Sequence, residues 1–407
     1  MKKLYVFYLL LVSMLVPSAI GALDFGFLTN QYVSYGNPGG EDVLEYRAGF
    51  VPRFSTFFGD TGSLFISGLF TIGYKDDALY YVPELLRTDF SMRFGGFGIR
   101  LGRMAYSDPL GFITEGLFDG LQLTHRSNAG QFSLGAWYTG FLYKKTVNIN
   151  MNINDQTIYN EELDYKYFAN TYFAPKRMFA SLDWEHPSVG EVLRIKTSFM
   201  GQIDLTDKDD KIHSQYFTLK FGLPAGRFLF ELGGTLGMAQ EESVGSAADN
   251  YFSAAGSFEL FWALPTINSS HLSFTGYYAS GKMNEDFTAF IPVTTKYFGE
   301  IFQAKLTGLT VLSLNYSGRL SETFGASLSA SYYVRNDLVT PNSYPINAAA
   351  NDNFFLGAEF FARFIWSPVS DLQLNLGGGA YIPALGNVWP DEKLQWKLEL
   401  TAVVSIY

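Results

Sequence analysis

Residues 393–407 read KLQWKLELTAVVSIY, and polar and apolar side chains alternate along this stretch. Trp396, Leu398, Leu400 and Ile406 fall on one side of an extended chain, and Lys397, Glu399, Thr401 and Ser405 fall on the other. Successive side chains of a β-strand point to opposite faces of its sheet, so this period of two predicts a strand with one apolar face. The same alternation runs through Ser63–Tyr74 and Leu372–Leu376. We find no comparable helical periodicity, and the sequence predicts an all-β protein.

The composition agrees with β-structure and excludes several functional classes. The 407 residues include 40 Gly, 38 Phe and 26 Tyr, and aromatic residues favour strands whereas glycine favours turns and close backbone approaches. The chain has no Cys, which excludes disulfides and cysteine-based metal or redox sites. The net charge of −10 argues against a nucleic-acid partner.

The first 22 residues have the features of a cleavable export signal. Lys2 and Lys3 precede an apolar run at 4–16, and small residues follow at 17–22. The run is shorter than the roughly 20 residues that span a bilayer, so a retained anchor is the less favoured alternative. We therefore expect a signal peptide at 1–22 and one domain at 23–407.

Short and long connections between the alternating runs follow one another along the chain. Short, turn-rich clusters occur near 59–62, 95–96, 128–130, 186–191, 224–226, 265–270, 321–323 and 368–371. Longer polar connections lie near 36–42, 76–79, 107–120, 145–164, 205–212, 241–250, 282–298, 336–352 and 383–392. Tight turns at one end and long loops at the other are typical of an outer-membrane barrel, with the tight turns in the periplasm. We expect a transmembrane, antiparallel, up-and-down β-barrel of about 18 strands (16–18), integral to the bacterial outer membrane.

Aromatic residues gather at the short-turn ends of the strands. Such residues form girdles where barrel strands cross a membrane interface, whereas in a soluble barrel they would only pack the rim. The girdle candidates are Phe57, Phe94, Phe97, Trp184, Trp262 and Trp366. The terminal Tyr407 resembles the C-terminal signal that the barrel-assembly machinery reads, so this machinery and outer-membrane lipid are expected partners.

Charged strand residues lie mostly opposite the apolar face, where they would line the lumen. Arg103 is the exception to strict alternation, at a strand end. Two interpretations stay open for the arginine-rich first third of the lumen: a constriction that favours anions, or a ladder of ion pairs that holds the barrel in register. The candidate lumen residues are Glu45, Arg47, Arg53, Arg87, Asp89, Arg93, Arg100 and Arg126.

The sequence shows no catalytic or metal-binding motif. The four His lack ligand spacing and no nucleophile elbow occurs, so we expect no enzyme activity, no metal and no cofactor. A wall-mounted hydrolase would have to use His125 near Asp119, or Asp183 with His186, and turn or interface roles explain these residues better.

The stretch Leu101-Gly102-Arg103, then 108–111 (DPLG), then 117–123 (LFDGLQL) resembles a recurrent feature of porin-like barrels. This group includes the alginate-export family and related substrate porins, and the resemblance implies about 18 strands and a channel. The mixed charge of the predicted lumen argues against a polyanion such as alginate.

The favoured hypothesis is a porin for diffusion of small hydrophilic solutes, with an anion preference suggested by the arginines. Inward folding of the loop at 145–164 or 107–120 would supply a constriction. The alternative is a surface adhesin or structural barrel with a plugged lumen. A transporter of hydrophobic compounds also stays open, although the first run begins at about Leu23 and leaves no room for an N-terminal plug. The sequence leaves a homo-oligomer open.

Overall fold

The structure is a computed structural model that describes residues 23–75, 78–207, 210–242, 249–265, 269–340, 351–389 and 391–406. The expected signal peptide and Tyr407 lie outside these residues. The strands are β1 (Asp24–Gly36), β2 (Val43–Phe58), β3 (Gly62–Lys75), β4 (Ala78–Phe94), β5 (Phe97–Ser107), β6 (Glu115–Ser127), β7 (Gly130–Tyr138), β8 (Arg177–Val189), β9 (Leu193–Asp204), β10 (Lys211–Ala225), β11 (Phe228–Glu242), β12 (Asp249–Ala263), β13 (His271–Ala279), β14 (Tyr297–Phe298), β15 (Ala304–Lys305), β16 (Leu309–Arg319), β17 (Phe324–Arg335), β18 (Phe355–Val369), β19 (Leu372–Ile382) and β20 (Gln395–Ile406). The helices are η1 (Pro38–Gly40), α2 (Lys144–Val147), α3 (Ile153–Asn160), η2 (Tyr165–Tyr167), α4 (Phe168–Thr171) and η4 (Pro383–Leu385).

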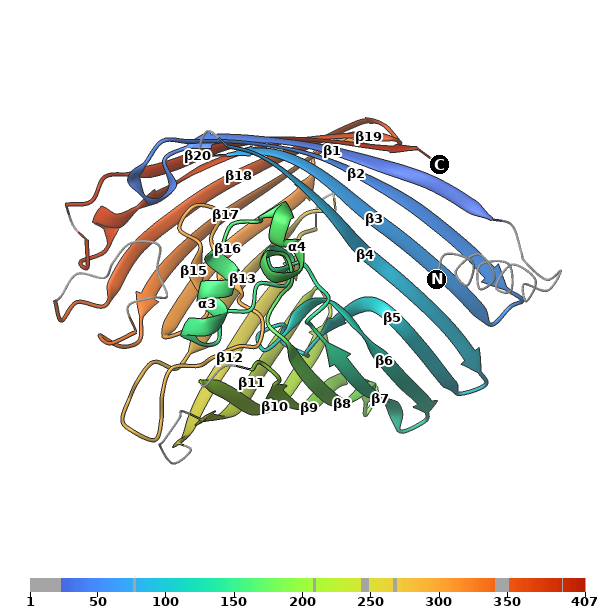
Figure 1. Ribbon diagram of the computed structural model, residues 1–407. Coiled ribbons are helices and arrows are strands. Elements are labelled where there is room, and N and C mark those ends of the chain that lie inside the picture. Colours follow the sequence, from blue (N-terminus) through green and yellow to red (C-terminus); the bar gives the residue numbers. More distant parts are fainter. Residues whose placement is uncertain are drawn as a thin grey trace.

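All strands except β14 and β15 form one antiparallel sheet of 18 strands that closes on itself (Figure 1). Each strand pairs with the next along the chain, with β13 pairing directly with β16. Closure comes from β1 and β20, whose register runs from Phe27 opposite Ile406 to Gly36 opposite Lys397. Closure removes the unpaired edges that an open sheet would expose. The predicted up-and-down barrel and its strand count are confirmed.

Connections at the two ends differ in length as predicted, but several bounds were wrong. The loop expected at 107–120 is only 108–114, because Leu117–Gly120 continue strand β6. The loop expected at 145–164 extends over 139–176 and contains four short helices, α2, α3, η2 and α4. The loop expected at 282–298 extends over 280–308. β3 ends at Lys75 and β4 starts at Ala78, so this connection is not long. The polar residues of the sequence predicted the middle of each loop correctly but not the positions where the strands end.

The outward face of the barrel is apolar. Large exposed side chains include Phe50, Phe70, Leu232 and Leu236, all on strands. Exposure of so many large apolar side chains fits a surface that meets lipid instead of water. No helix among the described residues is long and apolar enough to cross a membrane.

Inside the barrel the structure departs from the predicted polar lumen. Met104, Phe118, Trp137 and Phe179 on β5–β8 are almost fully buried. They form one apolar cluster with residues of the segments 108–114, 139–176 and 280–308, such as Phe290. A second cluster joins Phe302 and Trp389 to strands β16–β19. Alternation assigned the less apolar face to water, but loops that fold inward bury part of that face.

Candidate functional site in the barrel lumen

The first recess of the lumen lies beside the short turns and carries four arginines. Arg87 on β4 and Arg100 on β5 both bind Asp89, with Nη2 of each 2.6 Å from Asp89 Oδ2. Arg93 and Arg126 line the same recess of about 510 Å³. Neither has a carboxylate within ion-pair distance among the described residues, although Arg126 Nε donates to Gln131 Oε1 at 2.8 Å. Four cations against one carboxylate leave the recess with an excess of positive charge.

The arginine-rich patch is divided into a paired and an unpaired part among the described residues. Arg87 and Arg100 belong to an ion-pair ladder, because Asp89 neutralises one of them and fixes the position of both. Arg93 and Arg126 are exposed and line the recess. Exposed charges of one sign concentrate counter-ions in a pore whose walls have a low dielectric constant.

The second recess, of about 570 Å³, lies across strands β1, β2 and β18–β20. Arg363 Nη2 contacts Glu399 Oε1 at 2.8 Å and Glu300 Oε1 at 3.2 Å. Lys397 Nζ lies 2.9 Å from Glu399 Oε2. Arg47 also lines this recess, and its guanidinium lies over the ring of Tyr32 at 4.5 Å. Three cations and two carboxylates line the recess, and Glu45 beside it pairs with Arg47, so the charges are balanced.

Three inward segments hold one another in place between the strands. Val293 N donates to Ile113 O at 2.8 Å, which joins segment 280–308 to segment 108–114. Thr295 N donates to Asn148 O at 2.8 Å, which joins it to segment 139–176. These backbone bonds satisfy groups that would otherwise be buried without partners. Segments 108–114 and 139–176 are therefore joined by a third segment, 280–308, which the sequence marked only as a long connection. The constriction predicted from 107–120 or 145–164 stays a prediction.

Segment 108–114 is organised by one buried carboxylate. Asp108 accepts hydrogen bonds from the backbone N–H groups of Leu110 (3.0 Å), Ile113 (2.8 Å) and Thr114 (3.0 Å). Burial raises the pKa of the Asp108 carboxyl, and the backbone donors oppose that rise. The turn is therefore compact enough to place Phe112 and Ile113 in the apolar cluster.

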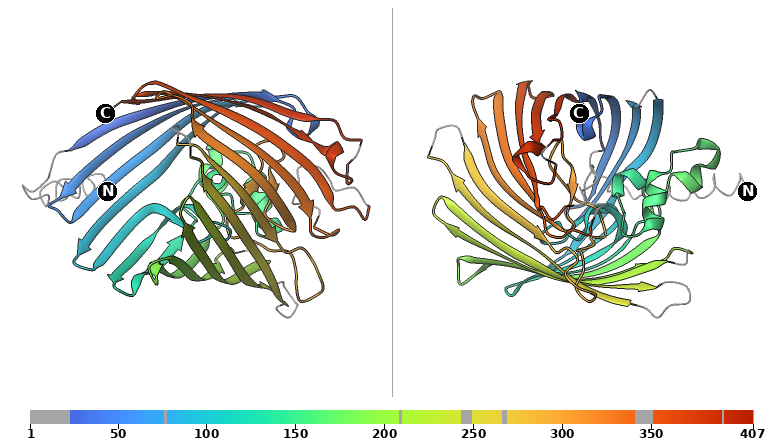
Figure 2. Two further views of the ribbon diagram at one scale, coloured as in Figure 1. Left: turned by 180° about the vertical axis from the view of Figure 1, so that it is seen from behind. Right: turned by 90° about the vertical axis from the view of Figure 1, so that its left-hand side faces the viewer.

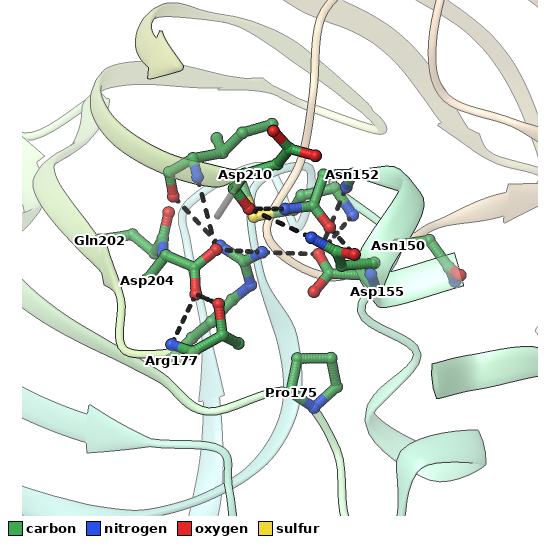
Figure 3. Close-up of polar contacts among 12 residues, drawn as sticks. Asn150, Asn152, Asp155, Pro175, Arg177, Gln202, Asp204 and Asp210 are labelled. Atoms are coloured by element: carbon green, nitrogen blue, oxygen red, sulfur yellow. Dashed lines mark hydrogen bonds and ion pairs between the residues drawn. The ribbon is translucent and has the colours of Figure 1, made fainter. Parts of the chain in front are cut away.

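Segment 139–176 is anchored to the barrel rim by a buried charge cluster (Figure 3). Arg177 Nη2, at the start of β8, lies 2.6 Å from Asp155 Oδ2 on α3 and 3.0 Å from Asp204 Oδ2 at the end of β9. The side chains of Arg177, Asp155 and Asp204 are completely buried. Burial raises the pKa of Asp155, with Asp204 acting in the same direction and Arg177 opposing it. We name this cluster the rim anchor.

Sequence reasoning missed the rim anchor. Asp155 lies in a loop and Asp204 at a strand end, and only the fold brings them within reach of Arg177. A weak signal was available at α3. Asn152 accepts a hydrogen bond from Asp155 N at 2.8 Å and Asp155 accepts from Asn152 N, so the pair forms a capping box.

The remaining predicted lumen residues lie on β2. Glu45 Oε1 is 3.0 Å from Arg47 Nε, and the pair sits beside the second recess. Arg53 lies opposite Gly26 of β1 and Ser67 of β3, away from Arg47. Five residues of the predicted set line the first recess and Arg47 lines the second, so the set does not form one patch.

Five of the six girdle candidates share the outward face near the short turns. Trp262 stacks on Phe228 at 5.8 Å, and the Trp184 indole N–H donates to Ala129 O at 2.8 Å. Phe57 does not share this outward face. Its cross-strand partner is Ser63, which lines the first recess, and residues directly opposite each other share a face. Phe57 thus lies on the lumen side, and its neighbour Phe58 is the one that faces outward. The other outward candidates are Phe94, Phe97 and Trp366.

The residues considered for hydrolytic chemistry have other contacts. His125 stacks on Phe97 at 4.3 Å, and His186 accepts a hydrogen bond from Ser188 N within a turn. Asp183 accepts from Ser198 Oγ at 2.6 Å. Among the described residues no group of three or more acidic or histidine side chains is arranged to hold a metal ion.

Comparison with known proteins finds similarity in structure alone. No family model and no curated protein matches the sequence. Pseudomonas aeruginosa OccK1 (OpdK) superposes with a TM-score of 0.59 at 11% identity over 94% of this chain and 98% of that one. Pseudomonas aeruginosa OccK5 (OpdH) gives 0.58 at 12% identity over the same shares. The chain has the fold of the outer-membrane porins.

A structure of Pseudomonas aeruginosa OpdK with vanillate is also similar, with a TM-score of 0.57 at 11% identity over 94% of this chain and 98% of that one. The barrel fold and the apolar outward face make this chain an integral outer-membrane protein. The predicted porin-like barrel is confirmed, and the names of these neighbours lend no support to the adhesin alternative.

Proposed function

We propose that the barrel is a channel for diffusion of small hydrophilic solutes, with a preference for anions. The observation that carries the proposal is the first recess, where Arg93 and Arg126 have no carboxylate partner among the described residues and lie beside the Arg87–Asp89–Arg100 ladder. A solute that gives up part of its hydration in the lumen can be compensated there by guanidinium groups. Such transport needs no covalent chemistry.

The solute class follows from the type of charge and the size of the spaces. Recesses of about 510 and 570 Å³ suit small molecules. Arginine binds carboxylates in a forked geometry, and the structure of OpdK with vanillate, by its name a carboxylate, is a precedent in a similar barrel. We infer that small carboxylates are the preferred anions.

Single-channel recording in planar bilayers tests the proposal. Stable conductance steps and a reversal potential of the sign for anions are expected from purified, folded protein in a salt gradient. A folded, heat-modifiable barrel without conductance would refute the channel. Clear cation selectivity would leave the channel standing and refute the anion preference.

A further inference from the structure

The wall of the barrel is incomplete between β4 and β5. Their register runs only from Phe90 opposite Leu101 to Phe94 opposite Phe97, which is the shortest pairing between neighbouring strands in the described barrel. Beyond Phe90, β4 continues to Ala78 paired only with β3, and β5 continues to Ser107 paired only with β6. We call this unpaired stretch the seam.

Local backbone geometry explains where the two strands part. β4 carries a bulge that leaves Leu86 without a partner on β3. Gly102 on β5 has φ of +111°, and a Cβ there would collide with the carbonyl oxygen of Thr88. Bulges bend and twist a strand, so the sequence itself separates β4 from β5 at this level.

Side chains, and not a strand ladder, contact β4 along the seam. The Tyr172 hydroxyl of segment 139–176 donates to Pro83 O at 2.7 Å, and Arg103 Nη1 donates to Leu85 O at 2.5 Å. Thr146 Oγ1 donates to Glu84 Oε2 at 3.0 Å. Pro83 has no N–H to leave unpaired, which suits a residue on a sheet edge. Segment 139–176 therefore takes the place of a neighbouring strand.

Arg103, the exception to alternation, shows that the segment covers the outer side of the wall. Arg103 pairs with Asp119 through two contacts of 2.9 and 2.8 Å. The two residues lie opposite each other, two positions from the Leu101–Leu121 pair, and therefore share its outward face. The arginine is nevertheless only 5% exposed, and its Nη2 also donates to Phe141 O at 3.0 Å. A charge on the lipid face is costly, so the covering segment keeps this ion pair out of lipid.

The covering segment contains an aromatic cluster and also contributes to the first apolar cluster. Tyr143, Phe168, Tyr172 and Phe173 contact one another, with ring centroids 4.5–6.3 Å apart. Leu142, Val147 and Ile149 belong to the first apolar cluster. Figure 2 (right) shows the segment between β4 and the strands that follow β5. The segment thus brings aromatic and apolar side chains to the seam, beside the Arg103–Asp119 ion pair and Glu84.

We propose that segment 139–176 is a lateral gate, and that its displacement opens the seam for amphiphilic molecules with an apolar, ring-sized body. A complete strand ladder would have to break a row of backbone hydrogen bonds to open, whereas the seam is closed by a few side-chain bonds. The rim anchor tethers α3 to β8 and β9, so the parts before and after α3 can move while the segment stays attached. This gate does not depend on diffusion of hydrophilic solutes along the barrel axis.

The chain contains no Cys, so an introduced pair can be cross-linked without background. Glu84→Cys with Thr146→Cys joins the edge of β4 to the segment. The two residues touch only through their side-chain ends, so a short bifunctional methanethiosulfonate suits them better than a direct disulfide. The matched control is Ser313→Cys with Ser331→Cys, directly opposite residues of β16 and β17 with hydroxyl oxygens 2.8 Å apart.

The readout is uptake of N-phenyl-1-naphthylamine, which fluoresces when it enters a membrane, by cells that carry the barrel in the outer membrane. Cross-linking at the seam should abolish barrel-dependent uptake, reduction should restore it, and the control pair should change nothing. Ion conductance in planar bilayers should survive the cross-link. Equal uptake before and after cross-linking, with the link verified, would overturn the gate.

A second variant opens the seam instead of locking it. Tyr172→Phe removes the hydroxyl that holds Pro83 O, and the loss of one net hydrogen bond should raise uptake about fivefold. Tyr165→Phe is the matched control, because its side chain is about half exposed on the same segment. Heat modifiability confirms that both variants fold. Unchanged uptake in folded Tyr172→Phe would also contradict the gate.

Discussion

Removing the two arginines that lack carboxylate partners in the first recess should weaken anion entry by a calculable amount. The double variant Arg93→Gln, Arg126→Gln leaves the Arg87–Asp89–Arg100 ladder in place. A sphere with the recess volume of about 510 Å³ has a radius of about 5 Å, which sets the distance between ion and charge.

At that distance each unit charge attracts a monovalent anion by about 0.8 kcal/mol in water, and screening at 0.1 M salt reduces this to about 0.5 kcal/mol. Two charges then contribute about 1 kcal/mol, which corresponds to about a fivefold change in anion entry. At 1 M salt the screening length falls to about 3 Å, and the same change should be less than about twofold.

Reversal potentials measured in salt gradients at low and at high mean salt give the ratio of anion to cation permeability. The matched control is Arg227→Gln with Arg319→Gln, which removes the same charge from exposed positions at other short turns. We expect a large fall in the ratio for the recess variant at low salt and little change for the control. An equal effect of both variants, or an effect that persists at 1 M salt, would refute the assignment of selectivity to this recess.

Three further perturbations test the parts that shape the lumen. Arg177→Met should destabilise the folded barrel by about 3–5 kcal/mol in urea titrations, because two buried carboxylates lose their cation. Adding Asp155→Asn to Arg177→Met should recover part of the lost stability. Burial raises the pKa of Asp155 in the folded state, so protonation of Asp155 favours folding. This stabilisation is complete below the unfolded pKa and is lost as pH rises through the raised folded pKa. The urea midpoint of Arg177→Met should therefore increase on acidification, and a midpoint independent of pH would contradict the assignment. Phe302→Ala removes a buried ring stacked on Tyr381 at 4.2 Å and should lower the free energy of unfolding by about 3–5 kcal/mol. Loosening of segment 280–308 should also enlarge or destabilise the conductance steps. The control Phe274→Ala, on the outward face, should leave the steps unchanged.

Much of the barrel could be read from local alternation. The strand that ends the chain, with Leu398 and Leu400 on one face and Glu399 on the other, shows the same division in the structure, where Leu398 and Leu400 are exposed and Glu399 is buried among Arg363 and Lys397. The arginines of β4–β6 were likewise expected on one face. A period of two is a local property, and it survives in any barrel that the strands form.

The sequence could not show which loops turn inward or what they bury. Trp137 and Phe179 lie on the inward face, and their apolar character has no explanation until Phe112, Phe290 and Leu142 from three separate segments pack against them. The rim anchor has the same origin, since Asp155, Arg177 and Asp204 are neighbours only in the fold.

The alternation of residues 393–407 and of the strands before them determined by itself a closed barrel with an apolar exterior, because each strand needs only its own sequence to divide its two faces. The tertiary structure alone decided how the interior is filled and where the wall is interrupted. Arg103 illustrates the difference: the sequence placed it on the outward face, and contacts with Leu85, Asp119 and Phe141 across three other parts of the chain explain how a charge can stay there.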